Sequence, residues 1–217
     1  MSSFPAIASS EALFSRSSLT ARPSPVPAEA GIYAWFFRKP LPGVDVSGCY
    51  QLDGYTLLYI GISPKEPSRD GFRTSRSNLR QRLRTHIGGN AEGSTLRKTL
   101  GCLLAPETGF PLRRVGTGRR LTFTNPGERA LDAWMDENAF VTWQVTAAPW
   151  NLERQILSSG LPLPLNIRDN PCEAHVNAVR AIRGAAVSAA LELPIVADSG
   201  GPRRLAASAS KSNEQLS

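Results

Sequence analysis

The sequence predicts an α+β fold in which a small central antiparallel three-stranded sheet is flanked by helices. Two aromatic and aliphatic runs, residues 31–37 and 55–62, are joined by a single loop, which favours an antiparallel pair of buried strands. Residues 140–147 form a third strand-like run. Segments with helical character lie between and after these runs, and a basic hairpin and a C-terminal helix complete the expected architecture.

Composition divides the chain into four parts. Residues 1–27 are rich in Ser, Pro and Ala without periodicity, so we expect a disordered N-terminal arm. A transit peptide is the alternative there, because the arm holds arginines and few acids. Residues 28–171 are expected to form the main domain, and 172–194 a helix packed on it. The Ser-, Ala- and Gly-rich residues 195–217 are expected to be a disordered tail.

Two serines are expected to begin helices in the middle of the chain. Residues 77–87 carry Leu79, Leu83 and Ile87 at i, i+4 and i+8, which is the apolar stripe of a helix that starts at a serine cap. A second helix is predicted for residues 94–104, again with a serine at its start.

The second half of the chain continues this alternation of elements. Residues 112–124 predict a basic hairpin that turns at 116–118, and residues 127–139 have the spacing of an amphipathic helix. The proline at position 149 favours the start of a helix that runs to about residue 159. The Ala-rich segment 175–193 is the expected C-terminal helix.

The composition excludes several classes of protein. No apolar run approaches the roughly 18 residues that a membrane helix needs, so no membrane partner is expected. The three cysteines, Cys49, Cys102 and Cys172, are widely spaced and only two histidines are present, which argues against a structural zinc site or a disulfide framework. Free thiols indicate a reducing compartment, and we expect a cytoplasmic protein.

The charge distribution predicts a nucleic-acid partner, with DNA preferred. The chain has a net charge of +7, and between residues 69 and 120 eleven arginines and one lysine oppose only three acids. Arginine can bind a phosphate through two parallel hydrogen bonds, although a solvated surface is the alternative for any charge-rich segment. The candidate contacts are Arg73, Arg76, Arg80, Arg84, Arg97, Lys98, Arg113, Arg114, Arg119 and Arg120.

Three side chains beside the apolar stripes could carry chemistry. Arg82 and His86 are four residues apart, so they share a helix face at the rim of the core. An arginine there could hold a phosphate, and a histidine could move a proton near neutral pH. Glu153 lies in the first turn of its helix, where a hard divalent cation could bind. Each has a structural alternative: a solvated arginine, a hydrogen-bonded imidazole, or a carboxylate favoured by the helix dipole.

The order of several motifs resembles that of the GIY-YIG nuclease superfamily. Both tripeptides that name the family are present letter for letter, and the later positions follow in the family's order on the expected element types. The resemblance covers about residues 28–170, with a longer loop between the second tripeptide and the arginine. The motifs are Gly31-Ile32-Tyr33, Tyr59-Ile60-Gly61, Arg82-x-x-x-His86, Glu153 and Asn166.

This resemblance implies a metal-dependent endonuclease that hydrolyses phosphodiester bonds in DNA by a single-metal mechanism. Glu153 would be the only carboxylate ligand of one Mg²⁺ or Mn²⁺ ion. Tyr33 would act as the general base or orient the attacking water. Free tyrosine titrates near ~10, so Tyr33 would need help from Arg82, His86 or the metal, and the sequence does not decide among them. Tyr59 would support Tyr33 or touch the substrate, Arg82 would hold the scissile phosphate, and Asn166 would position an active-site turn.

Two alternatives to an active nuclease stay open. The first is a non-catalytic nucleic-acid-binding module that retains the scaffold, although the presence of Glu153 favours activity. The second is an accessory nuclease domain that acts only with a partner protein, because neither a zinc finger nor a helix-turn-helix is apparent.

Overall fold

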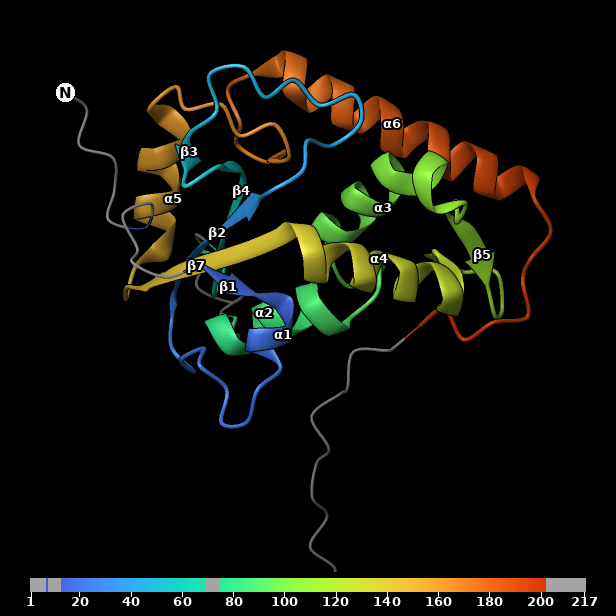
Figure 1. Cartoon of the computed structure of the whole chain (residues 1–217), viewed down its shortest axis with the longest axis horizontal. Coiled ribbons are helices and arrows are strands. Elements are labelled where there is room, and N and C mark those ends of the chain that lie inside the picture. Colours follow the sequence, from blue (N-terminus) through green and yellow to red (C-terminus); the bar gives the residue numbers. More distant parts are fainter. Residues whose placement is uncertain (1–6, 8–12, 69–74, 202–217) are drawn as a thin grey trace, which may run out of the picture.

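The computed structural model describes residues 7, 13–68 and 75–201, and a five-stranded antiparallel sheet lies at its centre (Figure 1). Helices cover both faces of this sheet, and a separate two-stranded hairpin lies beside them. The elements are β1 (Phe14–Ser15), α1 (Arg16–Leu19), β2 (Gly31–Phe37), β3 (Gln51–Leu52), β4 (Tyr55–Ser63), α2 (Leu79–Gly88), α3 (Thr95–Thr108), β5 (Arg113–Val115), β6 (Arg120–Thr122), α4 (Thr124–Asn138), β7 (Ala139–Val145), α5 (Pro149–Ser158) and α6 (Glu173–Glu192).

The strand order in the main sheet is β1-β7-β2-β4-β3, so the predicted number of three strands is wrong. The three central strands, β7, β2 and β4, are the three that the sequence predicted, and each neighbouring pair is antiparallel. The two additional strands are edge strands of two residues each. A two-residue strand is too short for an alternating pattern, so it forms only because a longer neighbour offers free hydrogen-bonding groups.

Strand β2 is buried along its whole length because both faces of the sheet are covered. Tyr33 and Trp35 point into a core formed with α2, α3 and α4. Ile32 and Phe36 point the other way, into a smaller core that includes Ile156 of α5. Figure 1 shows α5 on one side of the sheet and α3 and α4 on the other. This two-sided burial explains why the strand is apolar or aromatic throughout.

Helix α2 begins one residue later than expected. Its N-cap is Asn78, whose side chain accepts a hydrogen bond from the Gln81 backbone at 2.9 Å, while the Gln81 side chain accepts one from the Asn78 backbone at 3.3 Å. The predicted cap, Ser77, instead contacts the Ser63 hydroxyl at 2.7 Å. The next serine prediction is confirmed, because Ser94 is the N-cap of α3. The two reciprocal bonds of a capping box explain the preference for asparagine over its neighbour.

The expected disordered arm, residues 1–27, is wrong for residues 13–27. This segment forms β1 and α1, and Leu19 is buried against the main core. Arg16 forms two ion pairs with aspartates of α4, at 2.8 and 2.7 Å. A few such anchors hold a segment that has no periodic pattern, which is why composition alone misjudged it. The rest of that arm, apart from residue 7, lies outside the described residues.

The predicted C-terminal helix is confirmed as α6, which packs against α3 and the hairpin. The chain then returns along the hairpin, so the expected tail is ordered up to residue 201. Val196 bridges to Val115, and the Asp198 carboxylate accepts a hydrogen bond from the Asn125 backbone at 3.0 Å. Residues 202–217 lie outside the described part of the chain.

The cysteines of the described chain are free thiols. Cys49 and Cys102 are buried free thiols, and Cys172 is a half-buried one. Across the described ranges, no helix combines the length and apolar character required to cross a membrane.

Candidate active site

The two tripeptides of the sequence lie on adjacent strands and are interlocked by their glycines. Tyr33 on β2 faces Gly61 on β4, and a Cβ atom placed on Gly61 would collide with the Tyr33 ring, lying only 2.6 Å from its Cζ. A Cβ on Gly31 would likewise collide with the Gln144 carbonyl oxygen on β7 and lie 2.6 Å from Leu79 Cδ1. Gly61 therefore provides the space in which the Tyr33 ring lies across strand β4.

The Tyr33 hydroxyl is held by two side chains of α2. Its oxygen lies 2.8 Å from His86 Nε2, and it accepts a hydrogen bond from Arg82 Nε at 3.3 Å. The predicted shared helix face is therefore confirmed. The expectation that His86 meets solvent at the rim of the core is wrong, because its side chain is completely buried, whereas Arg82 is half-buried.

His86 is enclosed by Tyr33, Trp35 and Tyr59 of the sheet and by the start of α3. Its Nδ1 lies 2.7 Å from the hydroxyl of Ser94, the N-cap of α3. Burial lowers the pKa of His86 well below its ordinary value, and the nearby charges of Arg82 and Arg97 lower it further. The imidazole is therefore neutral at physiological pH, and one of its two nitrogens is a hydrogen-bond acceptor.

The environment of Tyr33 opposes its ionisation. Burial raises the pKa of Tyr33 above its ordinary value, and Tyr59 adds to this effect. Arg82 acts in the opposite direction, because its charge and its hydrogen bond lower the Tyr33 pKa. In the resting protein Tyr33 is therefore a neutral phenol that contacts a neutral imidazole.

Tyr59 lies beside this pair on β4. Its ring centroid is 6.4 Å from that of Tyr33 and 6.4 Å from that of His86. Burial raises the pKa of Tyr59, and the charge of Arg82 partly offsets the rise. The three aromatic rings and the guanidinium form one cluster on the face of the sheet that α2 covers.

Asn166 acts on the strand rather than on the reacting groups. Its side chain accepts a hydrogen bond from the Ile60 backbone at 2.9 Å and donates one to the Ile60 carbonyl at 3.0 Å. These bonds replace a neighbouring strand at the edge of β4, beyond the end of the short strand β3. Asn166 therefore fixes the backbone on which Tyr59 and Gly61 lie, and its own backbone closes a turn by donating to the Leu163 carbonyl at 3.0 Å. Its predicted role in an active-site turn stays a prediction.

Glu153 is a half-buried carboxylate in the first half of α5. In the described part of the chain it makes neither a hydrogen bond nor an ion pair. Burial, followed by the charge of Asp169, raises the pKa of Glu153 to about 7. The charge of Glu153 in turn raises the pKa of Tyr33 and of Tyr59, which places this carboxylate within electrostatic reach of the tyrosines.

These properties make Glu153 the residue of this site that could hold a cation. No group of three or more Cys, His, Asp and Glu side chains suited to a metal occurs among residues 7, 13–68 and 75–201. Mg²⁺ needs only one or two protein carboxylates when water and a substrate phosphate supply its other ligands. An unpartnered carboxylate with a raised pKa fits that requirement, because a cation would displace the proton and compensate the buried charge.

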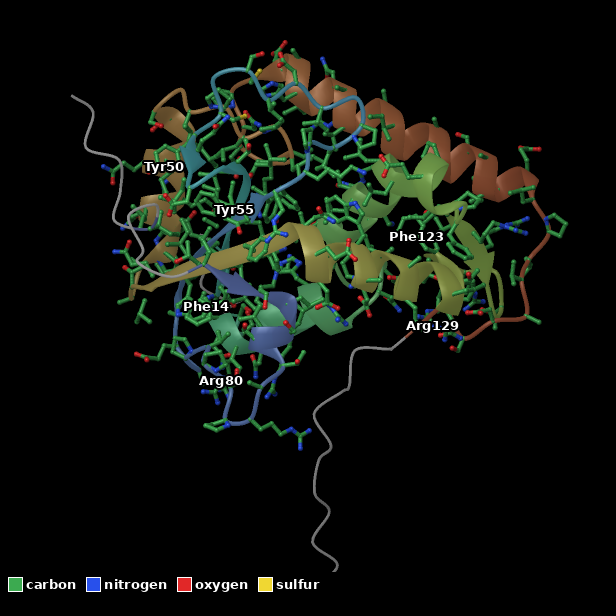
Figure 2. The ribbon with its side chains drawn as sticks, viewed as in Figure 1. Phe14, Tyr50, Tyr55, Arg80, Phe123 and Arg129 are labelled. Carbon is green, nitrogen blue, oxygen red and sulfur yellow. The ribbon has the colours of Figure 1, made fainter. Side chains whose placement is uncertain are left out.

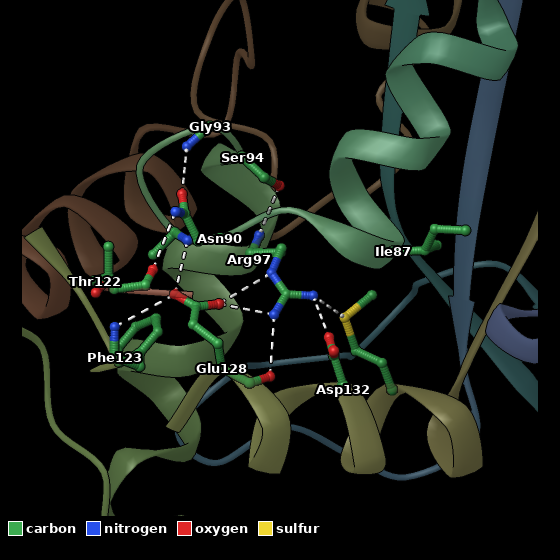
Figure 3. Close-up of polar contacts among 12 residues, drawn as sticks. Ile87, Asn90, Gly93, Ser94, Arg97, Thr122, Phe123, Glu128 and Asp132 are labelled. Atoms are coloured by element: carbon green, nitrogen blue, oxygen red, sulfur yellow. Dashed lines mark hydrogen bonds and ion pairs between the residues drawn. The ribbon is translucent and has the colours of Figure 1, made fainter. Parts of the chain in front are cut away.

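Arg97, predicted to contact nucleic acid, is instead part of the core. Its side chain is completely buried and forms ion pairs with Glu128 at 2.7 Å and with Asp132 at 2.6 Å (Figure 3). Its guanidinium also donates to the His86 carbonyl at 3.2 Å. The prediction was wrong because a local excess of basic residues does not reveal acids that approach from another helix.

The hairpin arginines are also engaged within the protein. Arg113 and Arg114 donate to the carbonyls of Pro194 and Leu193 at 2.9 and 2.8 Å, just beyond the end of α6. Arg120 forms an ion pair with Glu92 at 2.6 Å and donates to the Ser199 carbonyl at 2.6 Å. The predicted basic hairpin is therefore confirmed as an element, but these three side chains bind the C-terminal segment.

The other candidate contacts differ in exposure. Arg80 is half-buried and donates to the Val26 carbonyl at 2.7 Å, beside the loop before β2 (Figure 2). Lys98 is also half-buried, and the position of Arg73 lies outside the described residues. The exposed candidates are Arg76, Arg84 and Arg119. Arg84 is on the same helix as Arg82, so it is the exposed candidate closest in sequence to the cluster.

Sequence reasoning missed one residue of the site, Ser94, which it treated only as a helix cap. Nothing in the sequence marks this serine, since serine is a common N-cap. The turn after α2 brings it back to His86, eight positions earlier in the chain. Only the path of the chain between the two helices reveals this contact.

The fold and the site together define a catalytic domain of a recognised kind. The family model for the GIY-YIG catalytic domain matches residues 31–185, which is more than half of the chain, and the protein belongs to this family. Members of the family are generally nucleases, which supports nuclease activity and a nucleic-acid substrate in general terms. Neither the curated proteins nor the solved structures contain a significant match to the chain.

Proposed function

We propose that this protein is a divalent-metal-dependent endonuclease that hydrolyses phosphodiester bonds in DNA. One observation carries the proposal: the Tyr33 hydroxyl lies 2.8 Å from a neutral imidazole and 3.3 Å from an arginine. A phenol that serves only to fill a core does not need both an arginine and a buried histidine at its oxygen. The unpartnered Glu153 carboxylate nearby adds the group that a cation requires.

Tyr33 orients the attacking water and accepts its proton as the water oxygen bonds to phosphorus and the P–O bond to the leaving nucleotide oxygen breaks. The raised pKa of Tyr33 opposes loss of the phenolic proton, and two neighbours compensate. Arg82 stabilises negative charge on the phenolic oxygen, and the neutral His86 ring can accept the phenolic proton at Nε2. The proton therefore passes from water to Tyr33 while the proton of Tyr33 passes to His86.

Arg82 also has donors left for the substrate. Its Nε donates to Tyr33 and its guanidinium also hydrogen-bonds Tyr59, and the side chain is half-buried, so the donors that remain can bind the scissile phosphate. A Mg²⁺ or Mn²⁺ ion bound at Glu153 would supply positive charge to the leaving oxygen. Asn166 contributes by holding the β4 backbone, which keeps Tyr59 beside the reacting groups.

Plasmid cleavage with Mg²⁺ or Mn²⁺ tests this proposal. Tyr33→Phe and Glu153→Gln should each reduce the rate at least ~100-fold, which is the usual size of a lost general base or metal ligand. Tyr55→Phe and Glu137→Gln are matched controls, because Tyr55 bonds Arg38 away from this cluster and Glu137 is exposed on α4. DNA binding without cleavage under either ion would overturn the proposal in favour of a non-catalytic binding module.

A further inference from the structure

We propose that Ser94 is a positioning residue for the hydrolysis reaction, which fixes the ring of His86 so that Nε2 accepts a hydrogen bond from Tyr33. The inference rests on the proposed function, because it assigns the residue that prepares His86 for its part in proton transfer. Ser94 does not contact Tyr33 and acts only through the imidazole, with its Oγ 2.7 Å from His86 Nδ1.

The position of the Ser94 oxygen is set by α3. As the N-cap, Ser94 accepts a hydrogen bond from the Arg97 backbone at 3.1 Å, so its side chain has a fixed rotamer. The residue is completely buried, which excludes solvent from competing for the hydroxyl. Figure 3 shows Ser94 directed at the Arg97 backbone at the start of this helix.

This role of Ser94 requires one tautomer of His86. In it, the Tyr33 hydroxyl donates to His86 Nε2 while the Tyr33 oxygen accepts from Arg82 Nε. A neutral imidazole carries a single N–H, which must then lie on Nδ1 and be donated to Ser94. The serine oxygen has two lone pairs, which is enough to accept from both His86 and Arg97.

Arg97 hydrogen-bonds both residues of the Ser94–His86 contact. Its backbone donates to the Ser94 hydroxyl, and its guanidinium donates to the His86 carbonyl at 3.2 Å. The ion pairs of Arg97 with Glu128 and Asp132 fix that guanidinium against α4. The distance between Ser94 and His86 is therefore held by three helices and not by a single loop.

The groups that face His86 keep it neutral. Arg82 on α2 and Arg97 on α3 are the charged neighbours, and Tyr33 and Tyr59 approach from the sheet. Among the described residues, no carboxylate raises the pKa of His86 to stabilise the imidazolium. Ser94 is thus a neutral partner that orients the ring without charging it, so His86 enters the reaction as a neutral imidazole with one nitrogen able to accept a hydrogen bond.

The first test compares Ser94→Ala with Ser94→Thr in steady-state plasmid cleavage. Ser94→Ala should reduce kcat about 10–100-fold, the usual effect of losing a group that orients a catalytic residue, with KM for DNA unchanged within about twofold. Ser94→Thr keeps the hydroxyl and should retain most of the rate. Equal loss in both variants, or a loss that only follows the unfolded fraction, would overturn the proposal.

A double variant separates the role in positioning from the role in capping α3. If Ser94 acts through His86, Ser94→Ala should cause no further loss of kcat in a His86→Gln background, while it should still lower Tm through the lost cap. Additive losses of kcat would contradict the proposal. Ser94→Gly is a second control, because glycine is tolerated at an N-cap but has no hydroxyl.

Nitrogen NMR of His86 tests the proposal even if the protein cleaves nothing. The wild type should carry its ring proton on Nδ1, and Ser94→Ala should show a mixture of tautomers. A proton on Nε2 in the wild type, or an unchanged spectrum in Ser94→Ala, would refute the assignment. Absence of cleavage with the expected spectra would overturn the proposed function, and with it the role of Ser94 in hydrolysis, but not the orientation of the His86 ring by Ser94.

Discussion

Two regions of this protein handle polar groups in opposite ways. In the site on β2, β4, α2 and α5, Glu153 has no partner in the described chain, and the Arg82–Tyr33 bond is a long 3.3 Å. In the brace formed by α3, α4 and the hairpin, arginines form ion pairs at 2.6 to 2.7 Å. The site leaves a carboxylate without a partner in the described chain, whereas the brace pairs the guanidinium groups of Arg97 and Arg120 with carboxylates.

This difference separates function from stability. Polar groups without a partner in a partly buried site lower stability, but they are available to bind a substrate and a cation. A satisfied buried network stabilises one arrangement of helices, but it can bind nothing else. Changes in the brace should therefore affect folding, and changes in the site should affect activity first. The following predictions test this division from the largest expected effect to the smallest.

Removing Arg97 tests the brace most directly. Arg97→Ala leaves the buried Glu128 carboxylate without its guanidinium, so we expect a loss of about 3–5 kcal/mol in the free energy of unfolding. Urea unfolding measures this loss. Arg97→Met with Glu128→Gln removes both charges and should recover part of the loss. A stable Arg97→Ala protein with weakened DNA binding would show that Arg97 contacts DNA instead.

Gly61→Ala tests whether the shape of the site depends on the interlocked tripeptides. The new methyl group would occupy the space of the Tyr33 ring, so the ring must move away from His86. We expect a cleavage rate at least ~100-fold lower and a loss of about 1–3 kcal/mol in stability. Gly88→Ala is the control, because a Cβ there meets no atom within 4 Å. Normal cleavage by Gly61→Ala would contradict this account of the site.

The hairpin and α2 offer a direct comparison of two kinds of arginine. Arg113→Ala combined with Arg114→Ala removes two bonds to the carbonyls beyond α6 and should cost about 2 kcal/mol in stability, with DNA affinity little changed. Arg84→Ala should instead leave Tm unchanged and lower the salt dependence of DNA binding by about one phosphate contact. Fluorescence anisotropy at several salt concentrations measures both variants. The reverse pattern would place the DNA on the hairpin.

The fold was largely predictable because its central elements have strong local patterns. Strand β2 spans the predicted residues, 31–37. The ends of β4, α2, α5 and α6 lie within a few residues of the predicted ends. What failed depends on contacts between distant segments. The edge strands form only by hydrogen-bonding to longer neighbouring strands, and residues 13–27 are held by Arg16 and a few apolar contacts.

The site could be predicted to a similar extent. The order of motifs identified Tyr33, Arg82 and His86, which the structure places in contact. It could not reveal that His86 is completely buried, or that Ser94 contacts its other nitrogen. The charge count misassigned Arg97 because its partners come from α4, thirty or more residues further along the chain. Charge in a sequence indicates where cations are, but not which anions have already bound them.

The smallest predicted effect concerns the stability cost of Glu153. Its folded pKa of about 7 lies above its ordinary value of 4.5. Between these two pH values the carboxyl is therefore mostly protonated in the folded state and mostly ionised in the unfolded state. The stabilising contribution of the protonated carboxyl is fully present below pH ~4.5 and is lost as the pH rises through about 7. Glu153→Gln stays neutral, so in EDTA it should exceed the wild type in stability by about 1 kcal/mol at pH 8.5, after allowing for partial exposure, or about 2–4 °C in Tm. At pH 4 the two should unfold together. If Glu153→Gln is more stable than the wild type at high pH and inactive at every pH, the same carboxylate both destabilises the folded protein and is required for cleavage. Equal stability at pH 8.5 would mean that the charge of Glu153 is already compensated within the chain.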